Sequence, residues 1–217
     1  MFLFVAVSNN GTDGANFAIT SYQYYAGTES GCIAKGLLKS ETDPEGNITT
    51  YTYDADGNVK TVSDPETNKV TTNEYNRIGW KTATITPKGH RTEYVYDKNG
   101  QLIKANTVSA KNETNRIVYD LLGRRVQEIF PNQYDSAKDN LASDTYNDDT
   151  VGTGYEYFDS GKVKSVTDAL GNRTSYTYDV YGNTLTEKKP NGAIYHYEYD
   201  VLDRPRKVFF KDSADAI

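Results

Sequence analysis

An internal repeat constrains this chain more than any other feature of its sequence. Seven tyrosines stand 22, 21, 23, 38, 21 and 21 residues apart, and most are followed by aspartate and, four residues on, by glycine. The full pattern occurs at Tyr53, Asp54 and Gly57; Tyr96, Asp97 and Gly100; Tyr119, Asp120 and Gly123; and Tyr178, Asp179 and Gly182. Partial copies contain Tyr75 and Gly79, Tyr157 and Gly161, and Tyr199 and Asp200, with Asp203 in place of glycine. Such self-similarity indicates a repeat architecture.

A second turn signal precedes many of these tyrosines by seven residues. Gly46, Gly89, Gly171 and Gly192 hold this place, and Asn68 holds it once. The residues before them include Asp and Pro, which favour the first two positions of a turn. Glycine or asparagine then accepts the left-handed conformation that closes it. Each repeat therefore contains two turns.

Between the two turns the sequence alternates with period two, which predicts β-strands. The alternation is clear at 50–53, 93–96, 175–178 and 195–199, where tyrosines two apart share one face of the strand. A second short strand follows each Tyr-Asp turn, so one repeat is a β-hairpin of about 21 residues. We predict an all-β fold in which these hairpins stack into a strongly curved sheet or an open β-spiral.

Two regions depart from this pattern. The 38-residue interval holds a polar insertion at 130–154, in which Ser136–Ala142 is suited to a short helix and the remainder to a solvated excursion. Residues 1–36 are rich in glycine and asparagine and are interpreted as a degenerate first repeat or cap. The predicted organisation is therefore 1–36, repeats over 37–129, the insertion over 130–154, and repeats with the C-terminal end over 155–217.

Composition excludes several classes of protein. A single cysteine, Cys32, rules out an internal disulfide framework and a multi-cysteine zinc site. The net charge of −6 argues against nucleic acid, and no apolar run approaches the roughly 20 residues that span a bilayer. The short apolar stretch Phe2–Val7 is interpreted as a first strand or the start of an excised piece. Nineteen tyrosines predict a thin, tyrosine-rich layer in place of a thick aliphatic core.

The repeat carries a family resemblance. Gly-x-x-Thr-x-Tyr-x-Tyr-Asp-x-x-Gly-Asn, present at 46–58 and 171–183, resembles the Tyr-Asp repeat of the Rhs family, and the likeness covers roughly residues 36–210. That family includes bacterial Rhs polymorphic toxins, the cocoon-forming subunits of insecticidal toxin complexes, and animal teneurins. The resemblance implies a β-sheet that spirals into a hollow shell, which encloses a toxic polypeptide in bacterial members and forms part of an adhesion receptor in teneurins.

The chain also departs from that family pattern. Family shells contain far more repeats than seven, so this chain corresponds to a segment of a shell. Nothing after Tyr199 resembles the autoproteolytic segment that ends the bacterial shells, and Asp43–Gly46 lies in a repeat turn, so we do not transfer proteolysis to it.

Candidate chemistry is sparse. Asp54 to Asn58 resembles the start of a calcium loop, but its twelfth position is Pro65, which offers no side-chain ligand. His90 and His196 lie far apart in sequence and, like Cys32, outside any nucleophile motif. No glycine-rich phosphate loop is present. We therefore predict no enzyme activity, no catalytic residues, no metal and no cofactor.

The tyrosine rows leave one ambiguity. Tyr94, Tyr96, Tyr176, Tyr178 and Trp80 are suited to stacking against sugar rings if their face is exposed. Their regular recurrence favours the other interpretation, in which they pack on one another across strands.

The leading functional hypothesis is a non-catalytic scaffold, part of a shell that encloses or presents a toxin or an adhesive polypeptide. The alternatives are a glycan-binding surface module and an extracellular repeat protein that self-assembles through open edge strands. The predicted partners are other repeats of a larger shell, copies of this chain, an enclosed polypeptide or glycans. No nucleic acid and no membrane span are expected. The expected location is secreted or on a bacterial cell surface.

Overall fold

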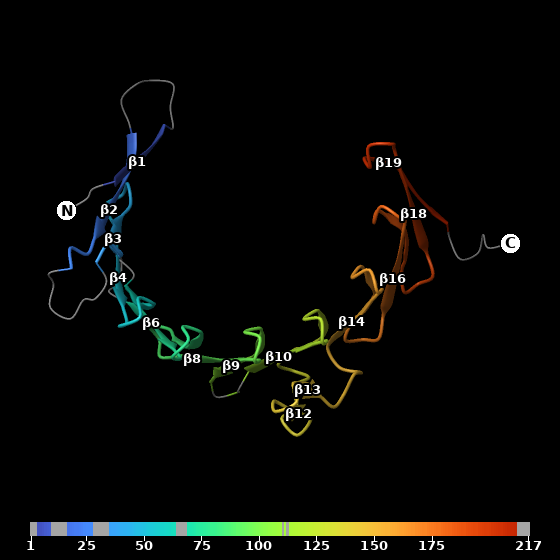
Figure 1. Ribbon diagram of the computed structural model, residues 1–217, viewed down its shortest axis with the longest axis horizontal. Helices are drawn as coiled ribbons and strands as arrows, with labels where there is room; N and C mark the ends of the chain where they lie inside the picture. Colours follow the sequence, from blue (N-terminus) through green and yellow to red (C-terminus); the bar gives the residue numbers. More distant parts are fainter. Residues whose placement is uncertain are drawn as a thin grey trace. The chain divides into compact units, whose positions relative to one another are not determined.

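The computed structural model describes residues 4–9, 17–27, 35–63, 69–109, 111 and 113–211. In these residues every regular element is a β-strand, which confirms the prediction of an all-β fold built from hairpins (Figure 1). None of the described residues forms a helix capable of crossing a membrane. Cys32 and the turn that contains Asn68 lie outside the described residues.

The chain divides into two compact units. The first comprises Met1–Val95 and Ala105–Asn112, and the second comprises Tyr96–Lys104 and Glu113–Ile217. The last residue of β8 and the first three residues of β9 therefore belong to the second unit.

In the first unit each strand pairs antiparallel with the next one in sequence, from β1 to β8. Its strands are β1 (Phe4–Asn9), β2 (Phe17–Tyr24), β3 (Leu38–Thr42), β4 (Ile48–Tyr53), β5 (Val59–Ser63), β6 (Val70–Tyr75), β7 (Lys81–Ile85), β8 (Arg91–Tyr96) and the larger part of β9 (Leu102–Val108).

The second unit follows the same rule with one interruption. Its strands are β10 (Glu113–Tyr119), β11 (Arg125–Ile129), β12 (Asp139–Asn140), β13 (Thr145–Tyr146), β14 (Thr153–Tyr157), β15 (Val163–Thr167), β16 (Arg173–Tyr178), β17 (Thr184–Lys188), β18 (Ile194–Tyr199) and β19 (Pro205–Lys211). Strand β11 pairs with β14, while β12 and β13 pair only with each other and stand off the row of strands near β10 (Figure 1). The insertion therefore replaces one turn, and the stacking of hairpins continues past it.

The turn chemistry fixes the register of each hairpin. In the hairpin of β4 and β5, Thr52 lies opposite Thr61 but Tyr53 lies opposite Val59, so the register shifts by one residue next to the turn. Gly57 has a φ of +87°, and its amide donates to the carbonyl oxygen of Asp54 at 3.2 Å, which closes a turn of the type that ends in a glycine bulge. The corresponding bonds of the other turns measure 2.9–3.2 Å. The same shift adjoins the tyrosine end of the other Tyr-Asp hairpins described in register.

Strands β2 and β3 pair as the two strands of a later hairpin do. Tyr24 pairs with Leu38 across the same kind of register shift that marks the tyrosines of the later repeats. Tyr25 and Leu37 then bond through their backbones, where Asp54 and Asn58 do so in a regular turn. Tyr24 therefore pairs in the same way as the repeat tyrosines.

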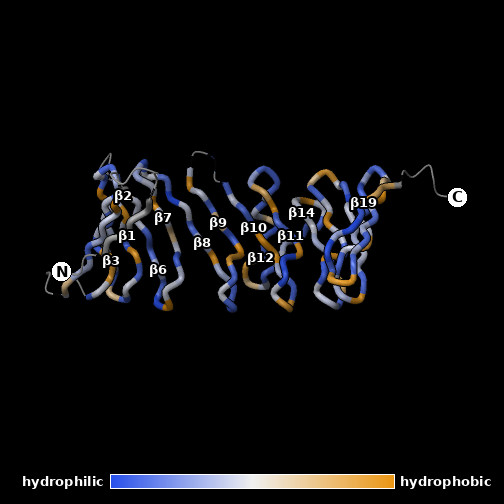
Figure 2. Tube along the Cα trace, turned by 90° about the horizontal axis from the view of Figure 1, so that it is seen from above, coloured by the Kyte–Doolittle hydropathy of each residue, from blue (hydrophilic) through white to orange (hydrophobic). Residues whose placement is uncertain are grey.

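Burial is shallow through most of the fold. Ala83, Ile103, Ile129 and Tyr146 are the buried apolar residues of the described part, and most strand tyrosines are half-buried. The strands are mostly hydrophilic or near neutral in hydropathy, with hydrophobic stretches at several strand ends (Figure 2). This agrees with a thin, tyrosine-rich layer in place of an aliphatic core.

The insertion corrects one prediction. Ser136–Ala142 forms no helix; it contains turns and the strand β12, which pairs with β13. Nor is the insertion simply solvated, because Tyr146 is buried and the side chain of Asp139 is only 3 % exposed. The tertiary contacts of these two residues, which the local sequence does not encode, outweigh a short helical propensity.

Candidate functional site

Six of the seven Tyr-Asp turns are held by a side-chain oxygen at their first position, and Phe158 takes that position in the remaining turn. Asp54 Oδ1 accepts hydrogen bonds from the backbone N–H of Asp56 at 3.0 Å and of Asn58 at 2.9 Å. The same pair of bonds recurs at Asp97, Asp120, Asp179 and Asp200, and Asn76 makes it with its amide oxygen. The repeat aspartate therefore acts on its own turn, as an Asx turn does.

These hydrogen bonds stabilise the ionised carboxylates. The pKa of Asp54 is lowered, chiefly by the hydrogen bond from the side chain of Asn58. The pKa values of Asp120, Asp179 and Asp200 are also lowered. Burial acts to raise them, but hydrogen bonds from Arg124, Asn183 and Arg204, respectively, outweigh it. The carboxylates of these aspartates therefore stabilise their own turns.

The repeat tyrosines tie each hairpin to the one before it. For five of them the hydroxyl donates to the carbonyl oxygen of the first residue of the preceding hairpin's second strand. These bonds join Tyr53 to Leu38 (2.8 Å), Tyr75 to Val59 (2.9 Å), Tyr119 to Leu102 (3.3 Å), Tyr157 to Arg125 (2.7 Å) and Tyr178 to Val163 (2.9 Å).

The register explains why a tyrosine is needed there. The ladder between β3 and β4 runs from Thr42 opposite Ile48 to Ser40 opposite Thr50 and goes no further toward the Tyr-Asp turn. Tyr53, three residues beyond that last pair, reaches back to Leu38. Its hydroxyl therefore satisfies a backbone carbonyl at the place where neighbouring hairpins stop pairing.

In three turns the side chain after the glycine bonds to the next turn. In the second unit Gln101 Nε2 donates to the carbonyl oxygen of Gly123 at 2.9 Å, and Asn183 Nδ2 donates to Asp203 Oδ1 at 2.8 Å. Arg124 Nη1 donates to the carbonyl oxygen of Phe158 at 3.3 Å. Our sequence analysis gave this position no role, although the Gly-Asn pairs at 57–58 and 182–183 marked it.

We call the row of turns at 97–100, 120–123, 158–161, 179–182 and 200–203 the Tyr-Asp rim of the second unit. Successive turns of this row lie on the same edge because each is separated from the next by two antiparallel strands. Asp203, with a φ of 58°, takes the left-handed conformation that glycine takes in the other turns. Tyr199 and Asp200 thus end β18 in a turn of the same shape, without the glycine.

The candidate sugar-stacking residues Tyr94, Tyr96, Tyr176, Tyr178 and Trp80 are all half-buried. Tyr178 is engaged within the sheet: its ring meets Phe158 edge to face at a centroid distance of 6.2 Å, and Lys162 Nζ lies 5.7 Å from its centre. Desolvation raises the pKa values of Tyr176 and Tyr178, which fits rings packed against their neighbours. Glycan stacking stays a prediction for these residues.

The two histidines have structural surroundings. The backbone N–H of His90 donates to Thr86 Oγ1 at 3.2 Å across a turn, and the ring of His196 stacks on Phe209 with a centroid distance of 5.2 Å. Across the described part of the chain, no group of three or more His, Cys, Asp or Glu side chains is placed to hold a metal ion.

A buried polar cluster lies beneath the insertion. Arg116 on β10 is fully buried; its Nε donates to Asp139 Oδ1 at 2.8 Å, and its Nη1 donates to the carbonyl oxygen of Ile103 at 3.2 Å. The other carboxylate oxygen of Asp139 accepts from the Tyr134 hydroxyl at 2.7 Å and from Lys104 Nζ at 3.3 Å. One carboxylate from the insertion therefore neutralises two cations from the sheet.

The cluster shifts the proton affinity of its members. Burial acts to raise the pKa of Asp139, but bonds to Arg116, Tyr134 and Lys104 outweigh it, so the pKa is lowered. Burial acts to lower the pKa of Lys104, and Tyr134 and Asp139 reverse that effect. Both charges are thus stabilised in their ionised forms, as a paired buried charge requires.

The insertion is also fastened where it returns to the sheet. Gln127 Nε2 donates to the carbonyl oxygens of Asp148 at 2.6 Å and Val151 at 2.8 Å. Lys138 pairs with Asp148 inside the insertion, and this ammonium, with Thr150, lowers the pKa of Asp148 to about 2. Sequence reasoning missed this cluster, because its members have no common spacing.

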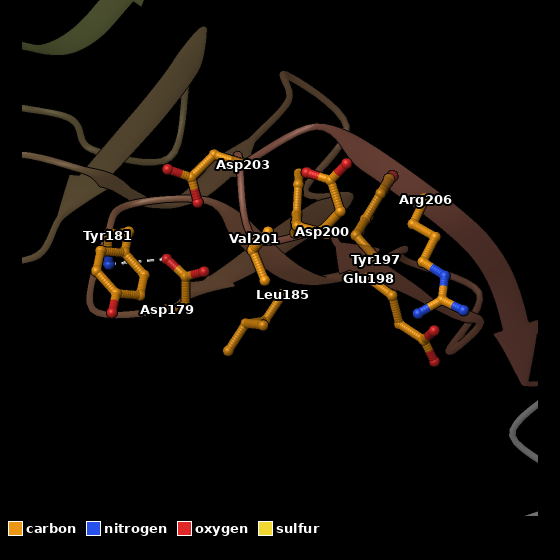
Figure 3. A pocket seen from close by; sticks show the side chains of 10 residues that line it. Asp179, Tyr181, Leu185, Tyr197, Glu198, Asp200, Val201, Asp203 and Arg206 are labelled. Atoms are coloured by element: carbon orange, nitrogen blue, oxygen red, sulfur yellow. Dashed lines mark hydrogen bonds between the residues drawn. The ribbon is translucent and has the colours of Figure 1, made fainter.

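A notch of about 740 Å³ opens on the Tyr-Asp rim between the turns at 179–182 and 200–203. Figure 3 shows Tyr181 and Asp179 on one side, Leu185 and Val201 near the middle, and Glu198 and Arg206 on the other side. The notch combines an apolar floor with charges of both signs. We call it the rim notch.

The sequence and the fold of this chain are similar to those of known RHS-repeat proteins. Residues 34–69 and 159–194 match the family model described as RHS Repeat. The chain is 33% identical over 196 residues to the tRNA3(Ser)-specific nuclease WapA of Bacillus spizizenii (strain DSM 15029 / JCM 12233 / NBRC 101239 / NRRL B-23049 / TU-B-10). It is 32% identical over 196 residues to the tRNA nuclease WapA of Bacillus subtilis (strain 168).

Each of these two alignments covers 82% of this chain but only 8% of the relative, so the chain spans a small part of their length. Among solved structures, the crystal structure of TcdB2-TccC3-TEV is similar in fold, with a TM-score of 0.54 and 14% sequence identity. That likeness covers 97% of this chain and 13% of the solved chain.

Proposed function

We propose, from the premise that this chain belongs to the RHS-repeat family, that it is a non-catalytic structural segment of a larger RHS shell. In this role the repeats form a wall that encloses or presents a toxin or an adhesive polypeptide. The protein that contains the wall is, in this proposal, secreted or displayed on a bacterial cell surface.

One observation carries the proposal: the side chains that recur along the repeats hold the hairpins and turns together. The repeat tyrosines bond to the backbone of the preceding hairpin, as Tyr178 does to Val163 at 2.9 Å. The repeat aspartates bond to their own turns, and Gln101, Arg124 and Asn183 after the glycines bond to the next turn. A catalytic or ligand-binding repeat would leave its recurring polar groups available to a substrate.

The names of the curated relatives raise an enzymatic alternative. Both are named as tRNA nucleases, and the chain matches 8% of each. We assign that activity to parts of the relatives beyond the matched segment, because phosphodiester cleavage requires convergent acid, base or metal groups. Of the two histidines of the chain, His196 stacks its ring on Phe209, and His90 is exposed in a turn that its backbone N–H helps to hold.

The proposal is tested by incubating the purified chain with total tRNA, with and without added divalent cations. A scaffold leaves the tRNA intact in both conditions. Cleavage that co-purifies with the chain and is lost in both His90→Ala and His196→Ala variants would overturn the proposal, provided that circular dichroism shows the variants still folded.

Glycan binding is a second candidate, supported by the partial exposure of Tyr94, Tyr176 and Trp80. A glycan array distinguishes it from the scaffold. Binding that disappears in Tyr94→Ala and Tyr176→Ala variants of unchanged fold supports the glycan function, and a blank array excludes it for the sugars tested.

A further inference from the structure

Three asparagines of the chain are followed directly by glycine, and this pair of residues is chemically reactive. The backbone nitrogen of the glycine attacks the side-chain Cγ of the asparagine, because glycine has no side chain to hinder the close approach. Asn10 with Gly11 lies outside the described residues, whereas Asn99 with Gly100 and Asn191 with Gly192 are described. The two described pairs can therefore be compared.

Both pairs lie at the same place in turns of the same shape. In each turn the asparagine is the third residue and the glycine is the fourth, with a φ of +86° at Gly100 and +89° at Gly192. The N–H of the glycine donates to the carbonyl oxygen of the first residue, which is Asp97 or Lys189. Both asparagines are exposed. Exposure and backbone shape therefore do not distinguish the two sites.

The first residue of the turn decides what the asparagine side chain does. Asp97 Oδ1 accepts hydrogen bonds from the backbone N–H of Asn99 at 2.9 Å and of Gln101 at 2.8 Å. The backbone donors of this turn are thus satisfied by the carboxylate. The side chain of Asn99 forms no hydrogen bond with any residue that the structure describes.

The second turn satisfies the equivalent backbone donor in another way, because the side chain of Lys189 has no acceptor atom. Here Asn191 Oδ1 accepts the hydrogen bond from the backbone N–H of Ala193 at 3.1 Å. This bond holds the amide group of Asn191 on its own turn. The aspartate that stabilises one turn therefore releases the side chain of Asn99, and its absence from the other turn engages the side chain of Asn191.

The attacking nitrogens differ in the same direction. The nitrogen of Gly192 lies 3.0 Å from the carbonyl oxygen of Lys189, and that of Gly100 lies 3.2 Å from the carbonyl oxygen of Asp97. The N–H must leave this bond and lose its proton before the nitrogen attacks. The shorter bond at Gly192 therefore opposes the reaction more strongly.

We propose that Asn99 is a site of spontaneous modification, at which the folded chain converts asparagine into aspartate and isoaspartate, and that Asn191 is protected from this reaction. The nitrogen of Gly100 loses its proton to solvent base and bonds to Asn99 Cγ. The bond from Cγ to the side-chain nitrogen breaks, and that nitrogen takes a proton from solvent and leaves as ammonia. Water then opens the succinimide ring at either carbonyl. This chemistry goes beyond the scaffold role, which needs no covalent change.

The modification changes a turn that is bonded to its neighbour. Ring opening at one carbonyl routes the main chain through the former side chain of Asn99 and lengthens the turn by a methylene group. Gln101, two residues further on, donates from Nε2 to the carbonyl oxygen of Gly123 at 2.9 Å. Isoaspartate at 99 therefore loosens a contact between successive turns, and the change accumulates as the protein ages.

The test follows both asparagines in the full 217-residue chain, incubated in the folded state at mildly alkaline pH. Peptide mapping by mass spectrometry measures the aspartate and isoaspartate formed at each position over time. Each rate is divided by the rate at the same position in the denatured chain, which removes the influence of neighbouring residues. We expect the normalised rate at Asn99 to exceed that at Asn191 by about two- to tenfold, the effect of a hydrogen bond that must first break.

A substitution in the second turn tests the cause. Lys189→Asp supplies the acceptor that Asp97 supplies in the other turn, so Asn191 should lose its bond to Ala193 and convert faster. Lys189→Ala removes the same side chain without adding an acceptor, and the rate at Asn191 should stay unchanged. Circular dichroism checks that both variants are folded.

Three results would overturn the proposal. The first is a normalised rate at Asn191 that equals or exceeds the rate at Asn99. The second is a folded chain in which Asn99 stays intact while the denatured chain converts. The third is a Lys189→Asp variant in which Asn191 converts no faster than it does in Lys189→Ala.

Discussion

The regular repeats and the 130–154 insertion stabilise the same sheet in opposite ways. In the repeats, half-buried tyrosines bond to backbone carbonyls, and ion pairs such as Glu156–Arg173 lie in the open, with both side chains 48% exposed. Under the insertion, Arg116 and Asp139 form an ion pair whose side chains are 0% and 3% exposed, next to the buried Ile103 and Ile129. Many weak, repeated hydrogen bonds and exposed ion pairs stabilise the regular repeats, whereas one buried ion pair attaches the insertion to the sheet.

The difference shows how a thin fold tolerates an added segment. The insertion replaces a single turn, so β11 still pairs with β14, and Tyr157 still reaches the carbonyl of Arg125 at 2.7 Å. The added residues then cover one face of the sheet near β10, where the chain gains its main buried contacts. The following substitutions test this contrast, beginning with the largest expected effect.

Asp139→Ala should destabilise the chain far more than Glu156→Ala. Removing Asp139 leaves Arg116 buried without its counter-charge, a change that typically costs about 3–5 kcal/mol. Glu156 pairs with Arg173 at 2.8 Å in solvent, and exposed pairs contribute about 0–1 kcal/mol. Chemical denaturation followed by circular dichroism measures both free energies of unfolding. Equal losses for the two variants would contradict the contrast.

Gly152→Ala should be the more damaging of two glycine substitutions with similar backbone angles. A Cβ at Gly152 would lie 2.1 Å from the carbonyl oxygen of Glu128, whereas a Cβ at Gly161 would meet nothing within 4 Å. Both residues have positive φ, 76° and 84°, so both variants carry the strain of the left-handed conformation, about 1 kcal/mol. The backbone clash should add about 1–3 kcal/mol at Gly152 alone.

Thermal unfolding of Gly152→Ala and Gly161→Ala, measured side by side, checks this prediction. A midpoint lowered as much in Gly161→Ala as in Gly152→Ala would mean that the insertion does not press on β11 at Glu128.

Acid should loosen the insertion through Asp148. The folded pKa of Asp148 is lowered to about 2 from an ordinary value of 3.8, so the unfolded chain binds more protons as pH falls. The stabilisation from the Lys138–Asp148 pair is therefore complete above about pH 5 and is lost as pH falls toward 2. Asp148→Asn should flatten the fall in stability over this range. Asp149→Asn, at the exposed neighbouring position, should not.

Tyr178→Phe should produce the smallest measurable change. It removes the hydroxyl that donates to Val163 and keeps the ring, so the expected loss is about 0.5–1.5 kcal/mol. Tyr181→Phe, at a turn tip that is 81% exposed, should leave stability unchanged. Denaturation curves that coincide for the two variants would show that the hydrogen bond from Tyr178 to Val163 does not stabilise the fold.

The repeats could be predicted from the sequence because local chemistry dictates them. Tyr53, Asp54 and Gly57 each act within their own turn or on the adjacent strand, and the same spacing returns along the chain. Period-two alternation then identified the strands. The role of the residue after the glycine was missed because a bond such as Asn183 to Asp203 becomes visible only when successive turns lie side by side.

The insertion could not be predicted for a different reason. Arg116 and Asp139 are 23 residues apart and belong to no periodic pattern, so nothing in the sequence marks them as partners. A polar, Asp-rich segment reads as solvated when its carboxylates are assumed to face water. Asp139 is buried because it forms ion pairs with two cations of the sheet, Arg116 and Lys104.

Amide hydrogen exchange across the second unit tests the central claim most directly, because it reports local stability strand by strand. The account predicts the slowest exchange in β10 and β11, beneath the insertion, and a lower, even level of protection from β15 to β18. In Asp139→Ala the protection of β10 and β11 should fall to that level while β15 to β18 stay unchanged. Loss of protection throughout the unit, or none at β10 and β11, would contradict a wall of self-sufficient repeats with one fastened insertion.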